Sequence, residues 1–449
     1  MSNSVYLVNA LIVNEGEKFL GNILVRDGII QSVEIGEPQI HTGIEKIDLD
    51  GKLLIPGVID DQVHFREPGL THKGDIFTES RAAIAGGVTS FMEMPNTFPP
   101  ALTQELLEEK YKLGAEKSLA NYSFYMGTSN SNLEEVLKTD PENVCGVKIF
   151  MGSSTGNMLV DDPKVLNEIF SKSKSLIATH CEDENTIKHN LQLAKDEFGE
   201  DVPFEKHAEI RNAEACFLSS SMAVNLAKNH GTRLHVLHLT TELEMQLFDD
   251  TKPLKEKKIT TEVCVHHLIF SKEDYAKYGW RIKWNPAVKE KSDRDALIKA
   301  LKSGKLDIVA TDHAPHTIEE KNSTYFKSPS GGPLVQHSLV AMLEFYHKGI
   351  FTLEEIVNKM CHAPAECFKI KNRGFIRPGY FADLCVVDID SPWMVTTENI
   401  LYKSKWSPFE GFSFKSKVLK TFVNGNLVFD EGTIKEEIKG MRLSFNKHF

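Results

Sequence analysis

Apolar residues gather in short runs through the middle of the chain, and amphipathic stretches separate these runs. Runs of this kind, rich in β-branched residues, are typical of buried strands. Eight strands are expected, at 53–64, 89–95, 120–127, 144–151, 175–181, 234–240, 259–265 and 306–312. The helix-like stretches between them lie at 75–85, 102–113, 131–138, 162–171, 208–229 and 292–303. Doubly wound sheets share this alternation, but a count of eight favours a (β/α)8 barrel of the TIM type.

Both ends of the chain have a different pattern. Four stretches there are rich in Val, Ile and Leu and have the character of strands: 4–14, 21–33, 382–388 and 418–429. Two of them contain Asp27-Gly28 and Asn424-Gly425, pairs that are typical of tight hairpin turns. We therefore expect a small β-sandwich domain built from residues 1–53 and 370–449, beside a barrel at 54–369. Two unrelated β extensions are the alternative.

Composition narrows the class of protein. The 449 residues are 41% hydrophobic and 26% charged, which is ordinary for a globular enzyme. A net charge of -11 argues against a general nucleic-acid or anionic-membrane surface. The seven cysteines are scattered without a C-x-x-C pair, and the N-terminus lacks signal-peptide features, so we expect a cytoplasmic protein. No apolar run approaches the roughly 20 residues that span a membrane.

Polar side chains that can bind metal stand where nearly every expected strand ends. A parallel barrel builds its active site at these ends. The segments are Asp60-Asp61-Gln62-Val63-His64-Phe65-Arg66, Met94-Pro95-Asn96-Thr97, Lys148, Thr179-His180, His238-Leu239-Thr240, His266-His267 and Asp312-His313-Ala314-Pro315-His316. A single His at a strand end is usually structural, and Lys148 has the alternative of reaching water from its apolar strand. The convergence of imidazoles with a carboxylate is instead typical of a site for zinc or a similar ion.

These segments carry a family resemblance over essentially the whole chain. The sequence resembles the cyclic amidohydrolases of the amidohydrolase superfamily, most closely the dihydroorotase family. The motifs are Leu54-Ile55-Pro56-Gly57-Val58-Ile59-Asp60, Val63-His64-Phe65-Arg66-Glu67-Pro68-Gly69, Met94-Pro95-Asn96-Thr97, Gly146-Val147-Lys148, Asn285-Pro286, Ala310-Thr311-Asp312-His313-Ala314-Pro315-His316 and Arg377-Pro378-Gly379-Tyr380-Phe381-Ala382-Asp383-Leu384.

The resemblance implies roles for the strand-end residues. His64 would be a ligand from the first strand. Lys148 would be carboxylated by CO2 and would bridge two metals, and one or two Zn²⁺ ions per chain are expected. His180 and His238 would bind the second metal. Asp312 would ligate the first metal and act as the general acid and base.

One position departs from the family pattern. The first strand of the family usually carries His-x-His, and this chain has Gln62 in the first of the two places. An amide oxygen is a weaker zinc ligand than an imidazole. Gln62 can ligate weakly, the first site can rely on His64, Lys148 and Asp312, or only the second site can be filled. We expect an active enzyme with one firmly bound zinc and a weaker first site.

The resemblance also indicates the substrate. Arg66 follows His64 by two residues in an extended strand, so both side chains should point the same way. Its guanidinium suits a carboxylate, and a surface ion pair with Glu67 is its alternative. The family pattern adds Asn96 and His316 to the carboxylate site and places Asn285 at the ring.

The expected reaction is the reversible hydrolysis of the ring amide of dihydroorotate to N-carbamoyl-aspartate, in pyrimidine biosynthesis. Hydroxide activated by the metal would attack the ring carbonyl. The alternatives are a hydantoinase, dihydropyrimidinase or allantoinase-like enzyme, and a non-catalytic partner of aspartate transcarbamoylase. The family suggests a homodimer.

Three further features of the sequence lie near the expected site. His235 precedes His238 by three residues on the same strand, so it faces the other side and is interpreted as structural. His266-His267 are interpreted as a supporting or structural pair. Residues 321–333 are rich in turn-forming residues and are either a lid over the site or a passive connection.

Overall fold

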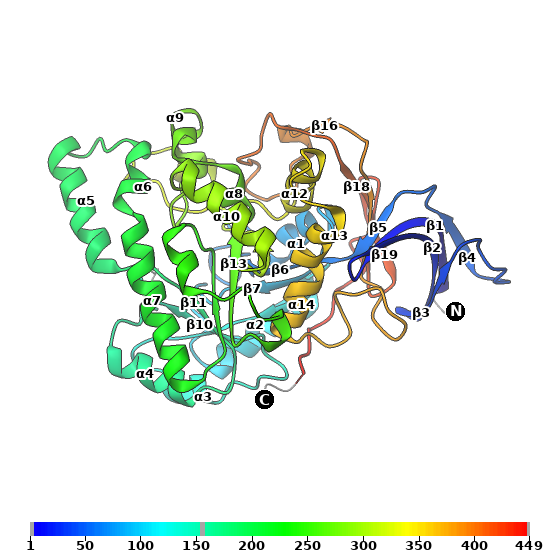
Figure 1. Ribbon diagram of the computed structural model, residues 1–449, viewed down its shortest axis with the longest axis horizontal. Helices are drawn as coiled ribbons and strands as arrows, with labels where there is room; N and C mark the ends of the chain where they lie inside the picture. Colours follow the sequence, from blue (N-terminus) through cyan, green and yellow to red (C-terminus); the bar gives the residue numbers. More distant parts are fainter. Residues whose placement is uncertain (1–3, 153–157, 447–449) are drawn as a thin grey trace.

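The computed structural model describes residues 4–152 and 158–446, and most of it is a parallel barrel (Figure 1). The barrel strands are β6 (Val58–Val63), β7 (Val88–Glu93), β8 (Asn121–Phe124), β9 (Met126–Gly127), β10 (Val147–Phe150), β11 (Ile177–His180), β12 (Leu234–Val236), β13 (Ile259–Cys264) and β14 (Ile308–Ala310). β8 and β9 share one strand position, so the expected eight positions of a (β/α)8 barrel are confirmed. Closure occurs where Val63 bridges His313.

Helices cover the outside of the barrel. They are α1 (Ile76–Ala85), α2 (Gln104–Lys117), α3 (Leu133–Leu137), α4 (Pro163–Lys172), α5 (Glu184–Phe198), α6 (His207–Ile210), α7 (Ala213–His230), α8 (Val265–Ile269), α9 (Tyr275–Tyr278), α10 (Lys291–Ser303), α11 (Ile318–Lys321), α12 (Ser338–His347), α13 (Leu353–Val357) and α14 (Ala363–Phe368). Side-chain caps fix several starts, for example Asp75 Oδ1, which accepts from the Thr78 amide at 2.8 Å. The expected helix at 208–229 is in fact two helices, because the chain breaks before Asn212 caps α7. No described helix is long and apolar enough to cross a membrane.

Strands from both ends of the chain join in one nine-stranded sheet beside the barrel, at the right of Figure 1. They are β1 (Ser4–Asn14), β2 (Glu17–Arg26), β3 (Ile29–Ile35), β4 (Glu45–Asp48), β5 (Leu53–Pro56), β15 (Leu384–Asp388), β18 (Lys417–Val423), β19 (Asn426–Asp430) and β20 (Thr433–Ile434). β5 lies between β1 and β15 and so connects the two ends. Apolar side chains from both ends, such as Leu7 and Leu384, share one buried cluster, as the β-sandwich prediction requires. β16 (Trp393–Met394) and β17 (Ser413–Phe414) pair separately.

The backbone confirms the expected hairpin turn at Asp27-Gly28 and contradicts the single strand expected at 53–64. Asp27 and Gly28 both have positive φ angles, 49° and 81°, and they form the predicted hairpin turn between β2 and β3. The single strand expected at 53–64 is wrong, because it divides at Gly57 into β5 of the terminal sheet and β6 of the barrel. A Cβ at Gly57 would lie 2.0 Å from Thr89 Oγ1, so only glycine allows this close approach.

Candidate active site

A cavity of about 700 Å³ opens where the barrel strands end. Every residue predicted for metal or substrate binding lines it: Gln62, His64, Arg66, Asn96, Lys148, His180, His238, Asn285, Asp312 and His316. These residues are up to 254 positions apart in the chain (62 to 316), and the barrel brings them together around one cavity. Whether each has its predicted role stays a prediction.

His180 and His238 face each other across one side of the cavity. His180 Nδ1 lies 3.0 Å from His238 Nε2, close to the about 3.3 Å that separates two nitrogens on one tetrahedral zinc. Burial lowers the pKa of both imidazoles, so both are neutral at pH 7 and keep a lone pair for a metal. His238 Nδ1 is buried without a hydrogen-bond partner among the described residues. The pair therefore fits a divalent ion.

Glu182 holds the far side of the His180 ring. Its Oε2 lies 3.1 Å from His180 Nε2, which directs a proton there and leaves Nδ1 for the cavity. Burial opposes ionisation of Glu182, but the neighbouring Arg211 and His180 outweigh it and lower its pKa to about 2. An ionised carboxylate behind an imidazole is the arrangement that orients histidine ligands in metal sites.

His64, Gln62 and Asp312 form the other side of the cavity. His64 Nε2 lies 3.1 Å from Asp312 Oδ1, and its Nδ1 lies 2.8 Å from Asn96 Oδ1. Gln62 also faces Asp312, with its Nε2 3.3 Å from the same carboxylate oxygen. The imidazole and an amide N–H thus share one carboxylate oxygen, whereas Gln62 Oε1, the atom that would ligate an ion, accepts from Cys264 Sγ at 3.6 Å.

Lys148 is buried between these two groups. Lys148 is 1% exposed, so the alternative that it reaches water is wrong. Burial lowers its pKa to about 8, although Asp312 and Glu262 act in the other direction. The ammonium lies over the Phe150 ring, 4.6 Å from its centroid. A substantial neutral fraction near pH 8 makes the amine a nucleophile toward CO2, which fits the predicted carboxylation.

Arg66 is a buried cation at the cavity wall. Its Nε donates to Pro315 O at 3.0 Å, and Nη2 lies 3.0 Å from His316 Nε2. Its guanidinium makes no ion pair with a carboxylate among the described residues, whereas Glu67 pairs with Lys117. The alternative of a surface ion pair between Arg66 and Glu67 is therefore wrong. Burial lowers the pKa of Arg66 to about 10, so it stays charged at pH 7.

Several polar residues around the cavity were not predicted. Lys73 Nζ lies 3.0 Å from His316 Nδ1, and Glu262 Oε1 accepts the His238 amide at 2.9 Å. A glutamate inside an apolar strand was the available signal for Glu262, and the spacing His180-x-Glu182 was the signal for Glu182. Lys73 lies in a loop whose path the sequence does not indicate.

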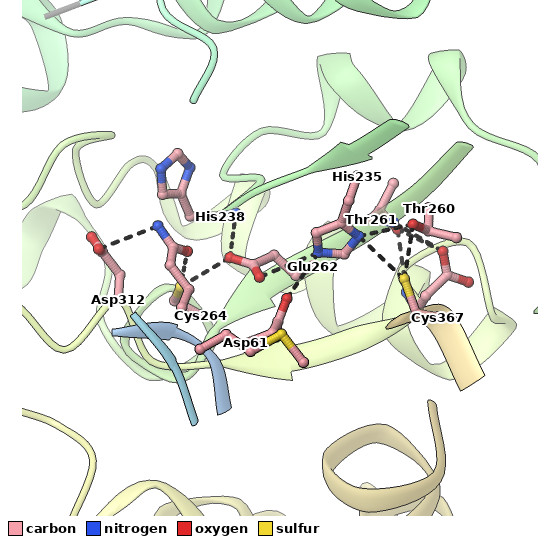
Figure 2. Close-up of polar contacts among 12 residues, drawn as sticks. Asp61, His235, His238, Thr260, Thr261, Glu262, Cys264, Asp312 and Cys367 are labelled. Atoms are coloured by element: carbon pink, nitrogen blue, oxygen red, sulfur yellow. Dashed lines mark hydrogen bonds and ion pairs between the residues drawn. The ribbon is translucent and has the colours of Figure 1, made fainter. Parts of the chain in front are cut away.

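His235 lies outside the cavity lining, in the interior of the barrel (Figure 2). Its Nε2 is 3.1 Å from Asp61 Oδ2 and 3.3 Å from Glu262 Oε2. All three side chains are fully buried. Its place in this polar cluster agrees with the structural interpretation. His266 and His267 are also buried and do not line the cavity.

Residues 53–428 match the model of the amidohydrolase family. The chain belongs to this family, and dihydroorotases are among its curated relatives. It is 30% identical to the dihydroorotase of Methanosphaera stadtmanae, over 92% of this chain and 94% of that protein. It is 32% identical to the dihydroorotase of Methanothermobacter thermautotrophicus, over 92% of each chain.

Solved structures of related enzymes share the fold. The L-hydantoinase (dihydropyrimidinase) of Arthrobacter aurescens superposes with a TM-score of 0.90 at 28% identity, over 96% of this chain and 97% of that one. The dihydropyrimidinase of Brevibacillus agri superposes with a TM-score of 0.86 at 23% identity, over 96% of each chain. The second likeness establishes the barrel with its β-sandwich domain and nothing about the substrate.

Proposed function

We propose that this amidohydrolase is a dihydroorotase, which hydrolyses the ring amide of dihydroorotate reversibly to N-carbamoyl-aspartate in pyrimidine biosynthesis. The observation that carries the proposal is Arg66. It is a buried guanidinium without a protein carboxylate, in the same cavity as four imidazoles, two lysines and Asp312. A buried cation of this kind is stabilised by an anionic ligand, and dihydroorotate has a ring carboxylate. The curated relatives named dihydroorotase agree with this substrate.

The donor set fits zinc, and one or two ions per chain are proposed. His180 and His238 would hold one ion, and His64 and Asp312 would hold the other, with Gln62 a weak or absent ligand. Lys148, carboxylated, would join the two. A bound ion would act as a Lewis acid. It would lower the pKa of water enough to yield hydroxide at neutral pH, and it would polarise the ring carbonyl.

The residues of the chain would bind the substrate and move the proton. Arg66, Asn96 and His316 would hold the ring carboxylate, and Asn285 would contact the ring. Burial lowers the pKa of His316 well below its usual range, so its ring is neutral and does not repel Arg66. Asp312 would take the proton of the attacking water and deliver it to the leaving nitrogen.

A hydantoinase or dihydropyrimidinase is the second candidate, because the Arthrobacter aurescens L-hydantoinase has nearly the same fold at 28% identity. Neutral rings such as dihydrouracil leave the buried Arg66 without a negatively charged partner, which disfavours this candidate and an allantoinase-like enzyme. The third candidate is a non-catalytic partner of aspartate transcarbamoylase, and only Gln62 suggests it.

A cytoplasmic homodimer remains the expected state of the protein.

Turnover of L-dihydroorotate and of dihydrouracil by the zinc-supplemented protein tests the proposal. We expect hydrolysis of dihydroorotate and little or none of dihydrouracil. Turnover of dihydrouracil alone would overturn the argument from Arg66 and support the catabolic enzyme. No turnover of either substrate by protein with bound zinc would support the non-catalytic partner.

A further inference from the structure

Lys73 is a second cation on the part of the cavity wall that Arg66 occupies. It lies in the loop between β6 and α1, and its side chain lines the cavity while only 14% exposed. Leu70 N donates to Arg66 O at 3.1 Å, and Lys73 N donates to Leu70 O at 3.0 Å. These two turns fold the loop back, so that Lys73 and Arg66 both reach the ring of His316.

The imidazole of His316 lies between these two cations. Arg66 Nη2 is 3.0 Å from its Nε2, and Lys73 Nζ is 3.0 Å from its Nδ1. Because burial lowers the pKa of His316 well below its usual range, the ring is neutral and accepts a hydrogen bond at only one nitrogen. His316 therefore satisfies one of the two cations, and the other faces a ring N–H.

The ammonium of Lys73 has more donors than the protein uses. It carries three N–H donors and no acceptor. Among the described residues, the only acceptors that contact Lys73 Nζ are His316 Nδ1, at 3.0 Å, and Glu320 Oε1, at 3.3 Å. At least one donor thus stays free for an acceptor in the cavity that the side chain lines.

The protein does not balance the charges at this part of the wall. Within the described part of the chain, Glu320 is the only carboxylate that contacts Lys73, and none pairs with Arg66. Glu320 is shared with His72 Nε2 at 3.1 Å and with the Thr317 amide at 3.2 Å. Two cations against one carboxylate leave one positive charge, which a single bound carboxylate would neutralise. Burial and the charge of Arg66 lower the pKa of Lys73, as expected for an ammonium without a full counter-charge.

We propose that Lys73 is a substrate-binding residue, whose ammonium binds the ring carboxylate together with Arg66 and helps the enzyme to select an anionic ring. The inference deepens the proposed function and rests on it, because dihydroorotate supplies the carboxylate. Lysine is a point charge on a flexible four-carbon stem, so its ammonium can turn from His316 Nδ1 toward a bound anion. The alternative is a structural ion pair, in which Lys73 only ties the loop after β6 to Glu320 of α11.

Orotate binding to the zinc-loaded full-length protein is the test, because orotate has the ring carboxylate and uracil is the same ring without it. In isothermal titration we expect Lys73→Met to weaken orotate binding by about tenfold or more and to leave uracil binding unchanged. Lys73→Arg keeps the charge and should bind orotate within about threefold of the wild type. Lys403→Met is the matched control, since Lys403 pairs with Asp75 at 2.7 Å and does not line the cavity. It should bind orotate like the wild type.

Glu320→Gln separates substrate binding by Lys73 from the structural ion pair. It removes the ion pair together with a negative charge that competes for Lys73, so orotate should bind this variant at least as tightly as the wild type. Equal weakening of orotate binding in Lys73→Met and Glu320→Gln overturns the inference, and so does an equal loss of orotate and uracil binding in Lys73→Met.

Assay of the same zinc-loaded samples separates the two proposals. Turnover of dihydroorotate with unchanged orotate binding in Lys73→Met contradicts only the role of Lys73. Orotate binding that Lys73→Met weakens, without turnover of dihydroorotate by the wild type, contradicts only the proposed function.

Discussion

At the scale of single residues, three side chains of the cavity stand on an unusual backbone. Arg66, His238 and Asp312 have φ angles of 72°, 38° and 49°. Non-glycine residues seldom adopt this left-handed region, and each instance costs on the order of 1–3 kcal/mol. Glu262 offsets part of this at His238 by accepting its amide. The strain coincides with strand ends that turn sharply so that their side chains converge on one cavity.

Arg66→Gln should lower kcat/KM for dihydroorotate by about 100-fold or more. The reason is that a buried carboxylate without its cation costs on the order of 2–5 kcal/mol. Steady-state kinetics measures this, and zinc content should stay at the wild-type level because Arg66 faces the substrate. An unchanged kcat/KM would contradict the assignment of Arg66 to the ring carboxylate.

Zinc retention should depend more on His180 and His238 than on Gln62. We expect His180→Ala and His238→Ala to lose more zinc than Gln62→Ala, because imidazole nitrogens are stronger ligands than an amide oxygen. Metal analysis after dialysis against a weak chelator measures the difference. Equal losses in all three variants would contradict a firm second site with a weaker first site.

At the scale of elements, the strands were predictable because each has a compact apolar run, and the predicted ends agree with the structure to within a few residues. The missed helix α5 has Ile187, Leu191, Ala194 and Phe198 at helical spacing, and they pack in one apolar cluster, so the sequence offered a signal for it. The division at Gly57 was also missed, since local pattern does not indicate which sheet a residue joins.

The segment 321–333 is held in place by two buried lysines. Lys283 Nζ donates to Tyr325 O at 2.7 Å and to Ser328 O at 2.6 Å, and Lys321 Nζ donates to Pro329 O at 2.8 Å. Pro329, Ser330 and Gly331 line the cavity. An opening lid would have to break these contacts.

Lys283 should make stability depend on pH. Burial, with Arg211 nearby, lowers its pKa to about 7, below the about 10.4 of an unfolded lysine. Between these values the unfolded chain binds more protons, so this residue makes the protein more stable as pH rises from about 7 toward 10. Urea midpoints across this range should rise less in Lys283→Met than in the wild type. Parallel plots of urea midpoint against pH for the two proteins would contradict the lowered pKa of Lys283.

At the scale of the whole molecule, Asp383 joins the barrel to the terminal sheet. It pairs with buried Arg373, accepts from Asn121 Nδ2 of β8 at 3.2 Å, and accepts from the Asn424 amide at 2.8 Å. One carboxylate thus links a barrel strand to the predicted hairpin turn of the sheet. The exact boundaries proposed for the two domains remain a prediction.

Asp383→Asn should destabilise the protein by about 3–5 kcal/mol, because it leaves the Arg373 charge buried without a partner. Asp388→Asn is the matched control, since it breaks only a partly exposed pair with Lys52 and should cost at most about 1 kcal/mol. Urea unfolding of both variants measures the difference. Similar decreases in the free energy of unfolding of the two variants would contradict the expected contribution of the Asp383–Arg373 pair.

The sequence by itself determined the alternation of strands and helices, the hairpin turns and the polar residues at strand ends. These follow from local periodicity and turn chemistry. His64 and Arg66 line the same cavity as expected, but not because the segment is extended, since β6 ends at Val63 and Arg66 has a φ of 72°. Only the tertiary structure decided that Cys264 lies beside Gln62, 202 residues away, and that Glu182 orients His180. Barrel closure sets such contacts, because it fixes which strand ends meet and how deep each side chain sits.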